Sequence, residues 1–251
     1  MEEGNLFAAP KTTPPTARDG DAAAWETALS ACTDCPLCRE GNRGPTGYTG
    51  PLTAPLMIVG EGPGGVEDEY GVPLVGPSGE LLNRALAFVG ISRECVYVTN
   101  VIKCRPRGNR TPTPAESLHC GRRWLLREIA TVNPAVILTL GKAALAFFAA
   151  PFAKVAPGIV RRRGQWIEWA GMDGVSGRPV MPTFHPAYLL RLHGREEVTA
   201  KWQVVDDFRA AMRRTEEAVG PVEWGGETPP HWREQWAPLR AARSTERGAI
   251  R

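Results

Sequence analysis

The sequence predicts an α/β fold, in which three αβα layers surround a central, mostly parallel four-stranded sheet. Short apolar runs of strand length alternate along the chain with longer helix-like segments. Polar or glycine residues follow three of these runs directly, at Gly60, Asn100 and His185. Ligands of open α/β sheets bind beyond the carboxyl ends of the strands. These three positions are therefore expected to meet in one crevice.

The four expected strands occupy residues 56–59, 95–99, 135–140 and 179–184. The segments between them are typical of helices. Residues 81–89 form a helical pattern between a serine and a glycine, and an Ala/Phe-rich helix follows Gly141. The clearest helix start is Thr113-Pro114-Ala115-Glu116, which has an N-cap residue, proline at the first helical position and glutamate at the third. This helix is expected to run to about Val132.

Composition predicts one domain with two extensions. The chain has 251 residues and 43% hydrophobic content, enough for a sizeable single core. Residues 21–215 are expected to form the domain and residues 1–20, rich in proline, threonine and charge, a disordered tail. The extension 216–251 contains Trp224, Trp232 and Trp236, so part of it is expected to dock and the rest to be disordered.

Charge and hydropathy set limits on partners and location. Thirty basic and 27 acidic residues give a net charge of +3, which is too mild to identify a nucleic-acid binder. No apolar run approaches the ~18 residues that span a bilayer, so no membrane association is expected. A cytoplasmic protein is predicted, in which cysteines are thiols or metal ligands rather than disulfides.

Four of the six cysteines form a pattern typical of a metal site. Cys32 and Cys35 are a C-x2-C pair, while Cys104 and Cys120 are separated by fifteen residues. A C-x2-C turn directs two sulfurs the same way, and the second pair completes a tetrathiolate site. Zinc and iron–sulfur both fit four thiolates, and free buried thiols are the alternative. Cys38 is an alternative ligand.

Three further segments resemble the signature motifs of the family-four, iron–sulfur-containing uracil-DNA glycosylases. They are GEGPGGVEDEYGVPLVGPSGELLN, VYVTNVIKCRPRGNRTPTPAE and FHPAYLLR. The four cysteines occupy the same family's ligand positions, and the resemblance covers about residues 25 to 214. It implies a 4Fe-4S cluster, hydrolysis of the bond between uracil and deoxyribose, and DNA as partner. We expect a monomer associated with the nucleoid.

The resemblance also implies roles for individual residues. Asn100 matches the position that reads uracil, and His185 the position that approaches uracil O2 as the base departs. Glu61 and Gly62 occupy the segment in which other members of the superfamily place a water-activating carboxylate, here replaced by glycine. Glu67 belongs to the same motif and is expected to order the loop or guard the pocket.

One departure concerns base stacking, because family members usually carry Phe where this chain has Leu74. Leucine offers no aromatic stacking, so weaker base binding is expected. By the same resemblance Leu189 or Leu190 fills the gap left by a flipped nucleotide, and Arg191 holds a flanking phosphate.

Two basic runs are candidates for phosphate contact, namely Arg105, Arg107 and Arg110 in the loop that includes Cys104, and residues 161–163.

The sequence leaves two other functions open. One is a glycosylase for another deaminated base, such as hypoxanthine or xanthine, and the other is a non-catalytic iron–sulfur module that binds DNA.

Overall fold

The fold is known from a computed structural model that describes residues 22–149 and 158–226. The expected N-terminal tail and the extension beyond residue 226 lie outside the described residues. One five-stranded sheet runs through the molecule in the order β2-β1-β3-β5-β4. Its strands are β1 (Leu56–Gly60), β2 (Tyr97–Asn100), β3 (Val136–Leu140), β4 (Ile167–Met172) and β5 (Val175–Thr183). All neighbours are parallel except β4, which is antiparallel to β5.

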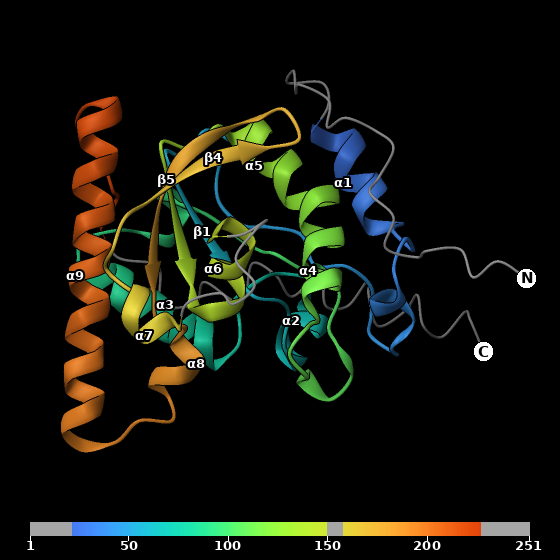
Figure 1. The fold of residues 1–251 in the computed structure, drawn as a ribbon, viewed down its shortest axis with the longest axis horizontal. Helices are drawn as coiled ribbons and strands as arrows, with labels where there is room; N and C mark the ends of the chain where they lie inside the picture. Colours follow the sequence, from blue (N-terminus) through green and yellow to red (C-terminus); the bar gives the residue numbers. More distant parts are fainter. Residues whose placement is uncertain (1–21, 150–157, 227–251) are drawn as a thin grey trace, which may run out of the picture.

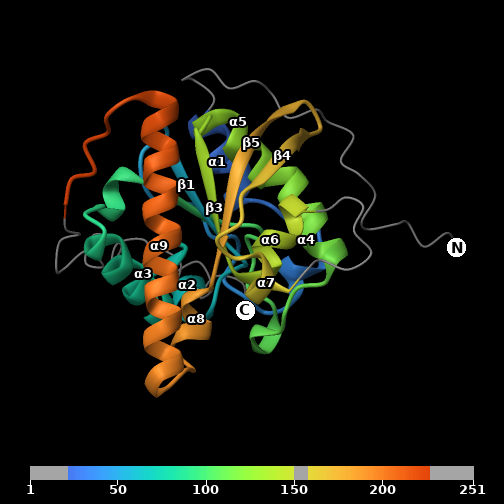
Figure 2. The same cartoon turned by 60° about the vertical axis from the view of Figure 1, so that its left-hand side comes forward.

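Helices cover both faces of the sheet, so the predicted three-layer αβα architecture is confirmed (Figure 1). One face packs against α3 (Pro77–Phe88), α8 (Pro186–Leu189) and α9 (Gly194–Val219). The other face packs against α1 (Ala22–Ser30), α4 (Pro114–Cys120), α5 (Leu126–Val132) and α6 (Gly141–Ala149). Figure 2 shows α9 and α3 on one side of the strands, with α4 and α6 on the other. The described residues also form two short helices, α2 (Gly65–Tyr70) and α7 (Ile159–Arg162).

Alternation along the strands explains the two layers of core. Leu56 and Ile58 belong to the cluster beneath α3 and α9, while Met57 and Val59 belong to the cluster beneath α4 to α6. Successive side chains of a strand point to opposite faces, so an unbroken apolar strand feeds both cores. The continuous apolar run in the sequence therefore indicated a central strand.

The prediction of four strands is wrong, because β4 adds a fifth. It is an edge strand with mostly exposed or half-buried side chains, and its sequence lacks the apolar run that marks a central strand. The missed signal is the Asp173-Gly174 pair that joins β4 to β5. Both residues have positive φ, 50° and 83°, as a type I′ hairpin turn requires.

The predicted start of the helix after Thr113 is confirmed. The Thr113 hydroxyl accepts a hydrogen bond from the Glu116 amide at 3.2 Å, and the Glu116 carboxylate accepts one from the Thr113 amide at 2.7 Å. Helix α4 then passes through a π-helical turn, Gly121–Leu125, before it continues as α5 to Val132. The wider turn begins directly after Cys120.

A buried ion pair anchors the end of β2. Lys103 Nζ lies 2.7 Å from Glu128 Oε2, and the two side chains are 1% and 0% exposed. The Thr99 hydroxyl donates to the same carboxylate at 3.0 Å. Burial raises the pKa of Glu128, and the Lys103 ammonium opposes that shift. The segment that follows β2 is thus tied to α5.

The chain beyond α9 folds back onto the domain as far as it is described. Trp224 is buried, its indole N–H donates to Glu216 at 2.8 Å, and its carbonyl accepts from the Ser92 amide at 2.6 Å.

Among the described residues, the structure contains no helix with the length and apolar character needed to cross a membrane.

We expect Glu128→Leu to lower the free energy of unfolding by about 3–5 kcal/mol, because it leaves the Lys103 ammonium buried without its partner. The double variant Lys103→Met/Glu128→Leu should regain most of that loss. Urea denaturation measures both. Glu197→Leu, which breaks the exposed pair with Lys201, is the matched control and should change stability little. A Glu128→Leu protein as stable as the wild type would contradict this account.

Candidate active site

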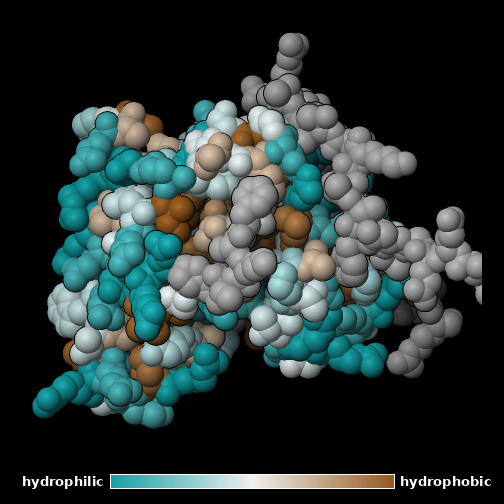
Figure 3. Space-filling view, viewed as in Figure 1, coloured by the Kyte–Doolittle hydropathy of each residue, from teal (hydrophilic) through white to brown (hydrophobic). Residues whose placement is uncertain are grey.

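A cleft of about 710 Å³ lies at the carboxyl ends of the parallel strands. It opens between the α8 side of the molecule and the loop that precedes α4, and Figure 3 shows the lower edge hollowed between these two sides. The predicted site residues that line it are Glu61, Gly62, Glu67, Leu74, His185, Leu190 and Arg191. Glu61 directly follows β1 and His185 lies two residues beyond β5, so two of the three predicted strand ends reach the cleft directly.

Asn100 lies behind the wall of this cleft rather than on its surface. The residue is 1% exposed, and a Cβ added to Gly60 would come within 2.3 Å of Asn100 Oδ1 and 3.6 Å of a Leu74 methyl group. Within the described part of the chain, neither Oδ1 nor Nδ2 of Asn100 has a hydrogen-bond partner. Leaving a buried amide unsatisfied costs about 1–3 kcal/mol per group, so this side chain is poised for a polar ligand.

His185 closes the opposite side as the N-cap of α8. Its Nδ1 accepts a hydrogen bond from the Ala187 amide at 3.1 Å, which places the proton of the neutral ring on Nε2. Burial lowers the pKa of His185 to about 4, with a smaller contribution from Arg191. A neutral imidazole with an Nε2–H donor therefore faces the cleft at neutral pH.

Gly141 allows this histidine to sit close to β3, a role that the sequence reasoning missed. The glycine has φ +82°, and a Cβ there would lie 2.9 Å from the His185 Cβ. The signal was present, because Gly141 directly follows the predicted strand 135–140. Lys142 and Tyr188 also line the cleft and were not predicted.

Glu61 and Gly62 occupy the floor near Ile102. Burial raises the pKa of the Glu61 carboxyl, a direction that makes the carboxylate a better proton acceptor. A Cβ on Gly62 would lie 2.5 Å from the Ile102 side chain, so a larger residue would require Ile102 to move. Of these two positions, Glu61 alone supplies a carboxylate.

Glu67 holds the loop rather than reaching across the cleft. Its Oε1 accepts from the Val75 and Gly76 amides at 3.1 and 2.7 Å, and its Oε2 accepts from the Gly64 amide at 3.1 Å. The carboxylate thereby joins the glycine-rich segment to the segment that carries Leu74. The sequence left loop ordering and pocket guarding open, and the contacts favour loop ordering.

The residues after His185 separate into core and rim. Leu189 is 4% exposed and packs in the core beneath α9, whereas Leu190 is 50% exposed and lines the cleft. Arg191 follows at the same rim. Adjacent positions on a helical turn point in different directions, which the sequence pattern alone did not resolve between the two leucines.

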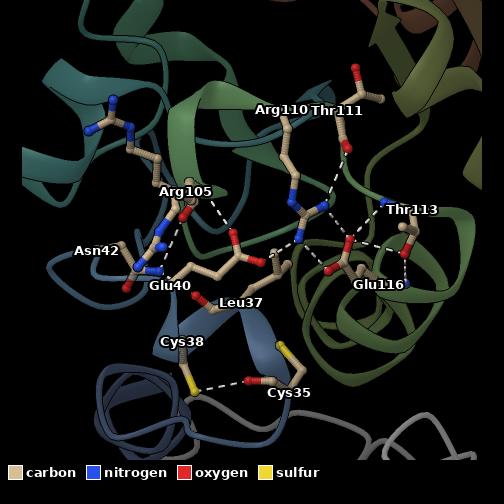
Figure 4. A network of polar contacts seen from close by, with 11 residues as sticks. Cys35, Leu37, Cys38, Glu40, Asn42, Arg105, Arg110, Thr111, Thr113 and Glu116 are labelled. Carbon is tan, nitrogen blue, oxygen red and sulfur yellow. Dashed lines mark hydrogen bonds and ion pairs between the residues drawn. The ribbon is translucent and has the colours of Figure 1, made fainter.

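The arginines of the loop before α4 differ in their surroundings (Figure 4). Arg110 forms ion pairs with Glu40 and, at 2.7 Å, with Glu116. That contact lowers the pKa of Glu116 to about 2. The Arg105 guanidinium donates to Asn109 at 2.7 Å, and Arg107 is exposed. Arg110 therefore braces the loop between two carboxylates.

In the second basic run, Arg163 binds Asp207 at 2.5 Å, while Arg161 and Arg162 are exposed. Asp207 in turn accepts from the Thr183 hydroxyl at 2.7 Å. Asp207 thus connects α9 to the end of β5, two residues before His185. Arg163 pairs with this carboxylate, so its partner lies within the protein.

The four predicted ligand cysteines line one small pocket beside the loop that precedes α4. Cys38, Lys103, His119 and Trp124 also line it, and Cys95 lies elsewhere, against Gly225.

Burial and the neighbouring thiols raise the pKa of Cys104, and burial raises the pKa of Cys120 to about 12. The Lys103 amide donates to Cys120 Sγ at 3.3 Å, whereas the Cys38 thiol donates to the Cys35 carbonyl.

In donor chemistry this pocket fits a tetrathiolate centre, because it brings two cysteine pairs together from distant parts of the sequence. Among the described residues, however, no group of three or more cysteine, histidine or acidic side chains is arranged to hold a metal ion in this structure. The pocket brings the four thiols together, and three of them, Cys35, Cys104 and Cys120, are buried.

Residues 46–209 match the uracil DNA glycosylase superfamily, and the chain belongs to this superfamily. It is 47% identical to a type-4 uracil-DNA glycosylase of Thermotoga maritima over 67% of this chain and 82% of that protein. It is 36% identical to a type-4 uracil-DNA glycosylase of Archaeoglobus fulgidus over 72% of this chain and 89% of that protein. A type-5 uracil-DNA glycosylase of Pyrobaculum aerophilum is 30% identical over 62% of this chain and 71% of that protein.

The low pKa of His185 predicts a pH-dependent contribution to stability. Because its folded-state pKa lies below the unfolded value of about 6.5, that contribution is complete above about pH 6.5 and is lost as pH falls toward 4. Between pH 7 and 4.5, wild-type protein should lose on the order of 2 kcal/mol more stability than His185→Gln. Urea denaturation at both pH values measures the difference. Equal losses would contradict the assignment.

Proposed function

We propose that this chain is a uracil-DNA glycosylase, which hydrolyses the N-glycosidic bond of uracil in DNA and leaves an abasic site for repair. The observation that carries the proposal is the Asn100 amide, buried without a partner beside the cleft that His185 lines. Membership of the superfamily and the names of the type-4 relatives support it.

Recognition would begin with extrusion of the nucleotide from the base stack, because the bond to be cut is inaccessible inside a duplex. The Asn100 Nδ2 can donate to uracil O4, and its Oδ1 can accept from uracil N3–H. Cytosine presents the reverse pattern and would leave both sets of groups unpaired. The site would therefore discriminate against cytosine, because binding cytosine would leave buried polar groups without hydrogen-bond partners.

His185 would stabilise the departing base. Negative charge develops on uracil O2 as the glycosidic bond breaks, and the Nε2–H of a neutral imidazole can donate to that oxygen. A fixed donor that strengthens its bond as charge develops lowers the barrier more than it stabilises the ground state. The Ala187 amide keeps the ring in the required tautomer.

Water activation falls to Glu61, since Gly62 offers no side chain. The raised pKa of Glu61 suits a proton acceptor, and the residue lines the cleft. The sugar cation that forms as the base leaves needs less activation of its attacking water than a neutral carbon would. Glu61 would therefore orient the water and accept its proton after attack.

The rim residues would hold DNA in the flipped state. Leu190, rather than the buried Leu189, can fill the gap in the stack, and Arg191 can contact a flanking phosphate. Arg105 and Arg107 lie in the loop before α4, other residues of which line the opposite side of the cleft, and they can contact phosphates there. Arg110 acts indirectly, through the carboxylates that fix this loop.

The cysteine pocket is proposed to hold a 4Fe-4S cluster bound by Cys32, Cys35, Cys104 and Cys120. When bound, the cluster would supply a rigid cross-link rather than redox chemistry in base excision. Its ligands join the N-terminal segment to the loop of Arg105 and Arg107, so the cluster would brace DNA binding.

Incubation with an oligonucleotide that contains one uracil should yield an abasic product with wild-type protein. Asn100→Asp should lower kcat/KM by about 100-fold or more, because a carboxylate cannot donate to O4. Gln165→Glu, the same amide-to-carboxylate change at an exposed position outside the cleft, should not alter it. Strand scission after alkali measures the product.

Absence of product at high protein concentration would contradict the glycosylase proposal and favour a non-catalytic module. Oligonucleotides with hypoxanthine or xanthine, added in competition, decide whether another deaminated base is preferred.

Freshly purified protein should be brown, with the broad visible absorption of an iron–sulfur cluster. Cys104→Ala should lose this absorption and bind DNA more weakly, whereas Cys95→Ala should retain both properties, because Cys95 lies outside the pocket. Visible spectroscopy, metal analysis and DNA-binding titration measure these outcomes. A colourless protein that contains zinc, or a Cys104→Ala protein with full DNA affinity, would contradict the proposed brace.

A further inference from the structure

Leu74 lines the cleft in a backbone conformation that leucine rarely adopts. Its φ is +51°, in the left-handed region that favours glycine. Such a conformation persists only where surrounding contacts fix it. A Cβ on Gly60 would lie 3.6 Å from a Leu74 methyl group and 2.3 Å from Asn100 Oδ1, so the placement of Leu74 sets the shape of the base pocket beside Gly60.

The groups that fix Leu74 carry opposite charges on its two sides. The Glu67 carboxylate accepts from the amides of Val75 and Gly76, which follow Leu74. The Arg93 guanidinium donates to the carbonyls of Leu74 and Pro73, at 2.9 and 2.7 Å. The turn is thus held through its amides by an anion and through its carbonyls by a cation.

Arg93 is itself buried, with 3% of its surface exposed. Its guanidinium also donates to Asn83 at 3.2 Å and to the Thr49 hydroxyl at 3.4 Å. Burial lowers the pKa of Arg93, and the Glu67 carboxylate opposes that shift. A planar guanidinium can bind two adjacent carbonyls with fixed geometry, which the ammonium of lysine cannot do.

Gly79 restricts the Leu74 carbonyl from the other direction. A Cβ on Gly79 would lie 1.8 Å from that oxygen, so the carbonyl has no room to move toward α3. The sequence reasoning assigned no role to either residue. Neither Arg93 nor Gly79 lines the cleft, and both act on the Leu74 backbone.

We propose that Arg93 is a positioning residue for base recognition, which holds the Pro73–Leu74 backbone so that the Leu74 side chain packs against the extruded uracil. This inference rests on the proposed function. A purely structural role would lower stability alone. A positioning role must instead weaken recognition of the base while contacts with the DNA backbone persist.

The test compares Arg93→Lys with wild type in two binding titrations. Affinity for free uracil should fall by about tenfold, a loss typical of a displaced contact. Affinity for an oligonucleotide with a tetrahydrofuran abasic analogue, which has no base, should not change. Hydrogen exchange at residues 72–79 should become faster. Arg178→Lys, which also alters guanidinium bonds to main-chain carbonyls but lies outside the cleft, is the control.

A double-mutant cycle tests whether Arg93 acts through Leu74. In a Leu74→Ala background, Arg93→Lys should reduce uracil affinity by less than about twofold, because the side chain that it positions is gone. Full additivity of the two losses would overturn the proposal. Unchanged hydrogen exchange at residues 72–79 in Arg93→Lys would overturn it as well.

Should Arg93→Lys fail to fold, Gly79→Ala displaces the Leu74 carbonyl from the opposite side. It should produce the same selective loss of uracil affinity, and equal losses for uracil and the abasic analogue would overturn the proposal. A wild-type protein that forms no abasic product would instead contradict the proposed function. Hydrogen exchange in the variants still reports on Arg93 in that case.

Discussion

The buried ion pair between Lys103 and Glu128 is the constraint on which the rest of the site depends. It ties down the segment 99–104, in which Asn100 lies behind the wall of the cleft and Cys104 lines the cysteine pocket. A charge this deep is costly without its partner, so the segment has little freedom to shift. Because the Lys103 amide also donates to Cys120, one short stretch of chain connects the residue proposed to read the base to the proposed metal centre.

Close backbone approach shapes the cleft as much as its side chains do. Gly60 leaves room for the Asn100 amide, and Gly141 leaves room for His185. Gly62 lies against Ile102, where other side chains would collide. Polar groups are then fixed by main-chain bonds, such as the Ala187 amide on His185 and the amides bound by Glu67. Preorganisation of this kind lets a few polar groups act without reorganising during the reaction.

Patterns local in sequence predicted much of the fold. Four apolar runs became the parallel strands, and the capping box at Thr113 marked the start of α4. The position of Gly60, Asn100 and His185 at the carboxyl ends of parallel strands followed from the pattern of apolar runs. Strand β4 was missed because an exposed edge strand has no apolar run, although the Asp173-Gly174 turn announced its hairpin.

By itself, the sequence determined the order of the four parallel strands, the residues at their ends and the two cysteine pairs, because these depend on spacing and periodicity along the chain. Only the tertiary structure decided which arginines form ion pairs within the protein. Arg110 pairs with Glu40, seventy residues away, and Arg163 pairs with Asp207. The structure likewise showed that Leu189 is buried and Leu190 exposed, and that Arg93 binds the Leu74 carbonyl. Burial and partnership between distant residues are products of packing, which residue spacing does not encode.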